Sequence, residues 1–228
     1  MLTLRKSSER GYADHGWLKS HHSFSFGSYH DERHMRFGAL RVINEDRVAP
    51  GAGFATHGHR DMEIISYVIE GRLAHRDSMG NGSEIVAGAV QRISAGRGIY
   101  HSEYNASEEE PVHFLQIWLE PDRQGLAPSY QEGRLGEGRN QLLLLAAPEG
   151  GAVSVHQDVR LYFGRFDQGR GQTLTLARGR RAYVHLVQGE LSVNGERLSA
   201  GDAVLLLDEE RVVLEAGKPA VVLVFDLA

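Results

Sequence analysis

Short runs in which apolar and polar residues alternate recur along this chain, and glycine-containing turns separate them. In the first half, such runs lie at residues 64–69, 72–77 and 112–119, and Asn81-Gly82 is a strong hairpin-turn signal. In the second half, they lie at residues 172–176, 182–187, 190–193, 203–207, 211–214 and 220–225. Because helical periodicity is scarce, the pattern predicts an all-β protein built as barrels or sandwiches, with few short helices.

An internal repeat divides this pattern into two halves. Residues 67–73 resemble residues 185–191 at an offset of 118, and residues 87–90 resemble residues 200–203 at an offset of 113. The polar, glycine-bearing stretch 128–138 is typical of a connection between domains. We therefore predict an N-terminal barrel over residues 1–130, a connection over 131–145 and a C-terminal barrel over 146–228.

Two pairs of metal-capable side chains lie in the first half, each pair separated by one residue. They are His57-Gly-His59 and His101-Ser-Glu103. On a β-strand, residues i and i+2 point to the same face, so two such strands would aim three imidazoles and one carboxylate at one point. This donor set suits a first-row divalent metal, and Fe, Ni, Mn, Cu, Co and Zn all tolerate it.

Composition narrows the class of protein further. The 228 residues carry a net charge of −5 and include no cysteine, so thiolate ligands and disulfides are excluded. No stretch is strongly basic, which gives no support to direct nucleic-acid binding. The first ten residues lack an apolar signal core, and no apolar run approaches the length of about 20 residues that spans a bilayer. We expect a cytoplasmic protein with no membrane segment.

The spacing of these motifs resembles that of a known family. One run resembles the first cupin motif and a second run resembles the second, and their defining residues are Gly51, His57, His59, Glu63 and Gly71, then Gly88, Ser94, Ala95, Gly96, His101 and Asn105. Ser94, where proline is usual, two extra residues before His101 and the internal repeat make the chain similar to the pirin family of bicupins. The resemblance is dense over residues 10–120 and weaker after that.

The pirin resemblance implies two tandem cupin barrels, which are double-stranded β-helices of jelly-roll type. It implies metal ligation by His57, His59, His101 and Glu103, with Fe(II) as the favoured metal. Bacterial members similar to this chain are associated with quercetin 2,3-dioxygenase activity, and mammalian members with transcriptional co-regulation.

Glu63 competes with Glu103 for the place of the carboxylate ligand. Most cupins use the glutamate that corresponds to Glu63, whereas the pirin pattern uses the one that corresponds to Glu103. Glu63 lies four residues after His59 and thus on the same face of a strand. We expect Glu63 to accept a hydrogen bond from a ligating imidazole. For proton transfer we expect Glu103 to be the catalytic base, with Glu63 as the second candidate.

The repeat alignment predicts that the C-terminal barrel has lost every ligand. It places Thr175 and Ala177 opposite His57 and His59. It also pairs Arg181 with Glu63, Leu214 with His101, and Ala216 with Glu103. One mononuclear centre per chain is expected, with a structural role for the second barrel.

The remaining histidines have simpler interpretations. The i, i+4 pair His30 and His34 surrounds a charged Asp-Glu-Arg segment, which favours a solvated loop. His21-His22 precedes an alternating segment and could pack near the site. Four single histidines in strand-like runs are expected to be hydrogen-bonded core or surface residues, namely His75, His113, His156 and His185.

The pirin resemblance, together with the metal-capable motifs, implies a metal-dependent dioxygenase that opens the heterocyclic ring of flavonols such as quercetin with O2 and releases CO. The substrate would be a flavonol-like small molecule, and the chain is expected to be a monomer because it already pairs two barrels. The alternative is a non-catalytic, metal-dependent pirin that senses redox state and contacts a protein partner.

Overall fold

The computed structural model describes all residues from Met1 to Ala228, and nearly every regular element in it is a β-strand. The chain forms two compact units. The first contains Arg10–Arg134 and Ala152–Gln157, and the second contains Met1–Glu9, Leu135–Gly151 and Asp158–Ala228. The only helical elements are two single 3₁₀ turns, so the predicted all-β class is confirmed.

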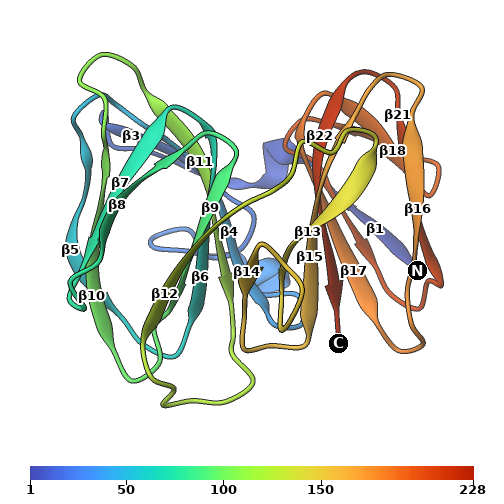
Figure 1. The fold of residues 1–228 in the computed structure, drawn as a ribbon. Coiled ribbons are helices and arrows are strands. Elements are labelled where there is room, and N and C mark those ends of the chain that lie inside the picture. Colours follow the sequence, from blue (N-terminus) through green and yellow to red (C-terminus); the bar gives the residue numbers. More distant parts are fainter. The chain divides into compact units, whose positions relative to one another are not determined.

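The first unit is built from two facing antiparallel sheets (Figure 1). The larger sheet has the strand order β12-β9-β6-β11-β4-β3-β2, and the smaller has the order β5-β10-β7-β8. Their bounds are β2 (Gly11–Asp14), β3 (Leu18–His22), β4 (Leu40–Val48), β5 (Gly53–His59), β6 (Glu63–Glu70), β7 (Arg72–Asp77), β8 (Gly82–Val86), β9 (Ala89–Ser94), β10 (Ile99–Asn105), β11 (Val112–Leu119) and β12 (Ser129–Arg134). The turn η2 (Glu32–His34) and the short strand β14 (Val153–Ser154) complete the unit.

The second unit repeats this arrangement. One sheet contains the order β1-β20-β17-β22-β15-β13, and the other the order β16-β21-β18-β19. The bounds are β1 (Leu2–Arg5), η1 (Ser7–Glu9), β13 (Gln141–Ala147), β15 (Val159–Phe166), β16 (Gly171–Thr175), β17 (Arg181–Gln188), β18 (Glu190–Val193), β19 (Glu196–Ser199), β20 (Ala203–Leu206), β21 (Arg211–Ala216) and β22 (Ala220–Leu227). The repeat found in the sequence is therefore a repeat of the fold.

Two edge strands depart from the predicted domain boundaries. Strand β1 pairs with β20, so residues 1–9 fold with the C-terminal barrel although they open the chain. Strand β12, expected to fall at the start of the connection, pairs with β9 along its whole length. Each strand covers an equivalent sheet edge, which would otherwise present unpaired backbone groups. Sequence periodicity cannot assign an edge strand to a sheet, because the partner is set by chain geometry.

The hairpin turns use residues that tolerate positive φ. Asn194 and Gly195 have φ values of 49° and 86° and join β18 to β19, as a type I′ turn requires. The other predicted turn lies slightly earlier than expected, because Gly82 already begins β8 and Gly80 takes the positive φ of 93°.

Both units bury an apolar interior through the alternation of their strands. In the second unit a continuous cluster includes Val184, Val204, Leu214 and Val224. In the first unit the apolar cluster around Phe114 fills only part of the interior. A second apolar cluster contains Ile64 and Ile93, and the first unit also buries polar side chains that include Ser66, Gln91 and Glu103. These buried polar side chains position the site described below.

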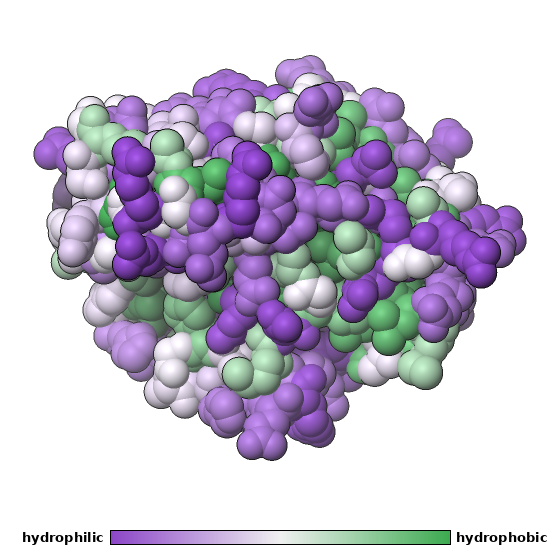
Figure 2. All heavy atoms as spheres, turned by 90° about the horizontal axis from the view of Figure 1, so that it is seen from below, coloured by the Kyte–Doolittle hydropathy of each residue, from purple (hydrophilic) through white to green (hydrophobic).

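One face of the molecule is mainly hydrophilic (Figure 2). On the face seen in Figure 2, polar and charged residues predominate, and hydrophobic side chains show between them in small patches. Neither 3₁₀ turn has the length or the apolar character that a membrane-crossing helix needs.

Candidate metal centre

Three histidines meet on the inner face of the smaller sheet of the first unit. His57 and His59 lie on β5, and His101 lies directly opposite His57 on the antiparallel neighbour β10. The ring centroids of the three imidazoles are separated by 4.5 to 4.9 Å. One ligand nitrogen from each lies within 4.8 Å of those of the other two. The His-x-His spacing therefore acts as expected, with both rings on one face of one strand.

A β-bulge between His101 and Glu103 then shifts the register of β10, so that Glu103 lies opposite Phe54. Glu103 is fully buried, and one of its carboxylate oxygens lies within 4.8 Å of ligand atoms of His101 and His75. The structure thus brings the carboxylate next to His101, as the sequence predicted. The ligand atoms thus form two close groups that share His101: one group contains His57 and His59, and the other contains His75 and Glu103.

A row of polar side chains crosses the larger sheet and holds Glu103 from the opposite side. The row consists of residues in direct register on five neighbouring strands, namely His22, Asn44, Gln116, Ser66 and Gln91. The Ser66 hydroxyl and the Gln91 amide donate to Oε1 of Glu103 at 3.1 and 2.5 Å, and the Gln116 amide donates to Oε2 at 2.8 Å. Hydrogen bonds to both oxygens fix the orientation of this carboxylate.

The second barrel has lost this row together with the ligands. The strand registers place Val184, Val204 and Val224 in the positions of Ser66, Gln91 and Gln116. The position of Glu103 falls on Leu214, because Leu214 lies opposite Gln172 as Glu103 lies opposite Phe54. A carboxylate inserted among these valines would have no donors, so the second barrel is built for apolar packing alone.

This register also corrects the repeat alignment. The sequence paired Leu214 with His101 and Ala216 with Glu103, whereas the structure makes Leu214 the counterpart of Glu103. The register shift between β5 and β10 has no equivalent between β16 and β21, so no single offset aligns both pairs of strands. Both groups of closely spaced metal-capable side chains lie in the first unit, and the interior of the second barrel is a continuous apolar cluster.

The chemistry of the donors fits a divalent metal. Both ring nitrogens of His101 are buried and have no hydrogen-bond partner. Nδ1 of His57 donates a hydrogen bond to the Ala55 carbonyl at 2.8 Å, which leaves the lone pair of Nε2 available for a metal. Two unsatisfied buried nitrogens on one ring would be costly in a protein without a ligand, and a metal would satisfy at least one of them.

Burial also sets the protonation of these groups before any metal binds. It lowers the pKa of His59 to about 4, with repulsion from His57 as a further cause. It lowers the pKa of His101 to about 3, aided by the neighbouring imidazoles. Burial raises the pKa of Glu103 to about 7, although its hydrogen bonds act in the opposite direction. The imidazoles of His59 and His101 are therefore neutral near pH 7 and ready to coordinate.

Glu63 does not take the place expected for it. It is buried on β6, where Ser94 donates to Oε2 at 2.9 Å and Nδ1 of His156 lies 3.3 Å from Oε1. None of its hydrogen bonds goes to His57, His59 or His101, so the expected contact with a ligating imidazole is absent. The even spacing between His59 and Glu63 does not place them on one face, because Glu63 lies on β6 of the larger sheet and the histidines lie on the smaller sheet.

Metal content should separate the two glutamates. We expect Glu103→Gln to lose most of its bound metal, because Glu103 is the carboxylate in the group of close ligand atoms around His101. Glu63→Gln should bind metal like the wild type, since Glu63 contacts Ser94 and His156 instead. Elemental analysis of both proteins after identical purification would measure this. Equal losses would show that both glutamates support the metal.

A cavity of about 570 Å³ opens onto the histidine cluster. His57 and His59 line it on one side, and Asn44, Asp46 and Gln116 line it on another; its aromatic walls are Trp17, Phe26, Phe54 and Trp118. Trp118 meets the ring of His59 edge-on at 4.9 Å. This volume and mixture of aromatic walls with a few polar groups suit a small, flat organic ligand.

His75 is a residue at this centre that the sequence did not single out. It is fully buried, its Nε2 donates to Asp77 at 3.1 Å, and its ring stacks on Tyr130 at 4.6 Å. The carboxylate of Asp77 is itself held by the turn that joins β7 to β8. A His75-x-Asp77 spacing on a strand was the available signal, since it resembles the histidine–carboxylate pairs found around metals.

The other single histidines behave largely as expected. His113 is buried and bonded to Glu45 at 3.0 Å, and His156 contacts Glu63 and Ser94. His185 is buried in the second unit. The pair His30 and His34 lies at the turn η2 and not on a longer helix.

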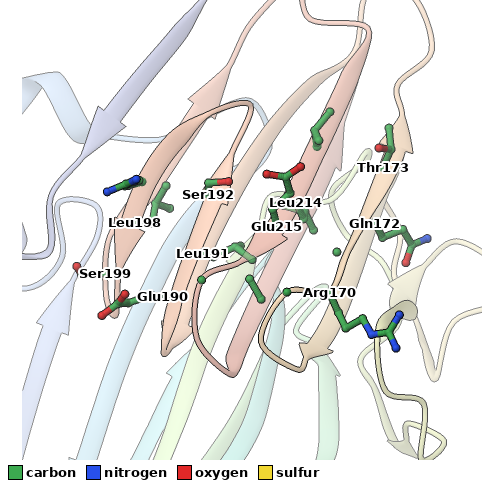
Figure 3. Close-up of a pocket in the computed structure, with 16 residues that line it drawn as sticks. Arg170, Gln172, Thr173, Glu190, Leu191, Ser192, Leu198, Ser199, Leu214 and Glu215 are labelled. Atoms are coloured by element: carbon green, nitrogen blue, oxygen red, sulfur yellow. The ribbon is translucent and has the colours of Figure 1, made fainter.

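A second hollow, over the smaller sheet of the second unit, differs from the first in chemistry (Figure 3). Its rim carries side chains such as Arg170, Glu190, Ser192 and Glu215, drawn as sticks in the close-up. These groups do not form a cluster of metal ligands.

Comparison with known proteins agrees with this division. The family model described as Pirin matches residues 3–119, and the model described as Quercetinase C-terminal cupin domain matches residues 144–227. A quercetin 2,3-dioxygenase from Escherichia coli is 44% identical over 229 residues, which cover 100% of this chain and 99% of the relative. A pirin-like protein from Caulobacter vibrioides is 40% identical over 233 residues and fully covered on both sides.

A solved structure extends the likeness to three dimensions. The crystal structure of the bacterial pirin YhhW from Escherichia coli in complex with nickel(II) has 42% sequence identity to this chain and a TM-score of 0.95. The alignment covers 100% of this chain and 99% of that one.

Proposed function

The chain belongs to the pirin family, and from that membership and its histidine–carboxylate centre we propose that it is a metal-dependent dioxygenase acting on flavonols. The reaction would open the heterocyclic ring with O2 and release CO. The observation that carries the proposal is the close group of His57, His59 and His101, of which His57 and His59 line an aromatic-walled cavity of about 570 Å³. The name of the Escherichia coli relative, quercetin 2,3-dioxygenase, supports the choice of substrate class.

In this proposal four side chains hold one divalent metal, namely His57, His59, His101 and Glu103. When bound there, the metal would act as a Lewis acid that lowers the pKa of a coordinated substrate hydroxyl and would supply the redox chemistry that O2 needs. We favour Fe(II) on the strength of the family resemblance. The nickel complex of the related YhhW supports a site that accepts more than one metal.

The chain's own residues supply binding and orientation. The aromatic walls, which include Phe54 and Trp118, would bury the flat rings of a flavonol and keep water from the reacting carbon atoms. Gln91, Gln116 and Ser66 hold Glu103 in one orientation. We further propose that one chain with its single centre is the functional unit, as a monomer.

Oxygen uptake tests the proposal directly. Metal-loaded protein incubated with quercetin in air should consume O2 and release CO, whereas His57→Ala should do neither. His156→Ala is the matched control, since His156 is absent from the metal cluster and should leave the rate unchanged. Oxygen uptake no faster than that of His57→Ala would reject flavonol dioxygenation.

A further inference from the structure

Neither glutamate that the sequence proposed as the base is well placed to take a proton from a substrate. Both oxygens of Glu103 already accept hydrogen bonds, from Ser66 and Gln91 on one side and Gln116 on the other. A metal would occupy a further lone pair of Glu103. Glu63 is not among the residues that line the cavity, and it is bonded to Ser94 and His156.

A third carboxyl group does line the cavity. Asp46 lies on β4 with only 2% of its surface exposed. The Ser20 hydroxyl donates to Oδ1 of Asp46 at 2.5 Å, and no protein group donates to Oδ2. A buried carboxylate with one free oxygen on a cavity is unusual, because most buried carboxylates are fully paired.

The position of Asp46 relates it to the metal centre. Asp46 follows Asn44 by two residues, which is about 6.8 Å along the strand, and Asn44 lies one strand spacing of about 4.8 Å from Gln116. Gln116 is the amide that holds Oε2 of Glu103. The Asp46 carboxyl therefore lies within the length of a flavonol from the centre, and its charge contributes to the raised pKa of Glu103, after burial.

The neighbours of Asp46 hold it in place without neutralising it. Nδ1 of His22 on β3 lies 2.8 Å from Oδ1 of Asn44, and Oγ of Ser20 lies 3.4 Å from the same nitrogen. The Ser20 hydroxyl donates to Asp46, so these residues do not form a nucleophilic triad. No lysine or arginine pairs with Asp46.

We propose that Asp46 is the catalytic base that accepts the hydroxyl proton of the bound flavonol. This inference rests on the proposed function and assigns its proton-transfer residue. The O–H bond of the substrate's 3-hydroxyl breaks, the proton passes to Oδ2 of Asp46, and the electron pair stays on the flavonolate oxygen. Both atoms of O2 then enter the ring-opened product, one carbon leaves as CO, and the proton returns to the carboxyl group of the product.

The acid–base properties of Asp46 agree with this role. Burial raises the pKa of Asp46 to about 7; the hydrogen bond from Ser20 opposes the shift, and the charge of Glu45 adds to it. A base is most effective when its pKa lies near the working pH, because it is then both ionised and able to hold a proton.

The test uses metal-loaded protein and quercetin without oxygen, so that turnover cannot occur. Bound flavonolate is distinguished from the neutral flavonol by its red-shifted absorption. At pH 7.5 the wild type should bind quercetin mainly as the anion. In Asp46→Asn the midpoint of ionisation should rise by at least one pH unit, while metal content stays unchanged. Glu63→Gln is the matched control, since it removes a buried carboxyl group that does not line the cavity and should leave the anion unchanged.

Turnover in air gives a second readout. We expect kcat of Asp46→Asn and of Asp46→Ala to fall by about 100-fold or more, in the range typical of a lost general base. Identical anaerobic spectra for wild type and both Asp46 variants would overturn the assignment of the base alone. Anion formation that depends on Asp46 but is followed by no oxygen uptake would overturn the dioxygenase and leave the base assignment standing.

Discussion

His101→Ala should abolish stoichiometric metal binding. His101 is the residue shared by both groups of closely spaced ligands, one with His57 and His59 and one with His75 and Glu103. It is also the histidine whose two nitrogens are both buried without a partner. We expect the dissociation constant for a divalent metal to rise by well over the ~100-fold that loss of an outer hydrogen-bond partner costs.

Calorimetric titration of the metal-free protein measures this effect, and thermal unfolding offers a second readout. Added metal at about 100 times its dissociation constant should stabilise the wild type by about 2.7 kcal/mol and the variant by nothing. His113→Ala serves as the control, because His113 is equally buried but bonded to Glu45. Undiminished metal content in His101→Ala would contradict the assignment of His101 as a metal ligand.

Asp46→Asn is expected to stabilise the metal-free protein above pH 7 while impairing its chemistry. Burial raises the pKa of Asp46 from 3.8 to about 7, so the folded state resists ionisation that the unfolded state undergoes freely. Each pKa unit corresponds to about 1.4 kcal/mol, and partial satisfaction of the new amide reduces the gain. We therefore expect an increase of about 1–4 kcal/mol in the free energy of unfolding at pH 8.

The sign follows from proton binding. Between pH 3.8 and about 7 the folded state holds a proton on Asp46 that the unfolded state has lost, so this group costs the wild type stability as the pH rises through that window. The difference between the variant and the wild type should be small near pH 4, grow up to pH 7 and then stay constant. Urea unfolding at a series of pH values would check it, and a difference independent of pH would refute it.

A loss of folding stability of the kind expected for Asp46 is typical of residues that serve catalysis. Stabilising substitutions are often found at strained or polar active-site positions, where activity and stability conflict. The second barrel has apolar side chains in the positions of Glu103 and the polar residues that hold it, and those side chains belong to one continuous apolar core. The polar interior of the first barrel is thus what separates the two otherwise similar units.

The sequence alone predicted much of this protein, because the relevant signals are local. Period-two alternation and glycine turns identified nine of the 22 strands, and the repeat identified two barrels. His57-Gly-His59 acts within one strand, where parity decides the face, and that expectation was met. The contribution of His101 required two strands to be neighbours, which the family resemblance supplied.

Tertiary structure decided what depends on contacts between distant strands. Glu63 and Glu103 are equally glutamates in the sequence, but only the sheet pairing shows that Glu103 meets His101 and that Glu63 meets His156. The polar row across five strands and the free oxygen of Asp46 are invisible along the chain, because each strand contributes one residue to the row and only the register of the sheet brings these residues together. Periodicity records which face a side chain occupies, whereas the partner across the barrel is set by how the sheets close.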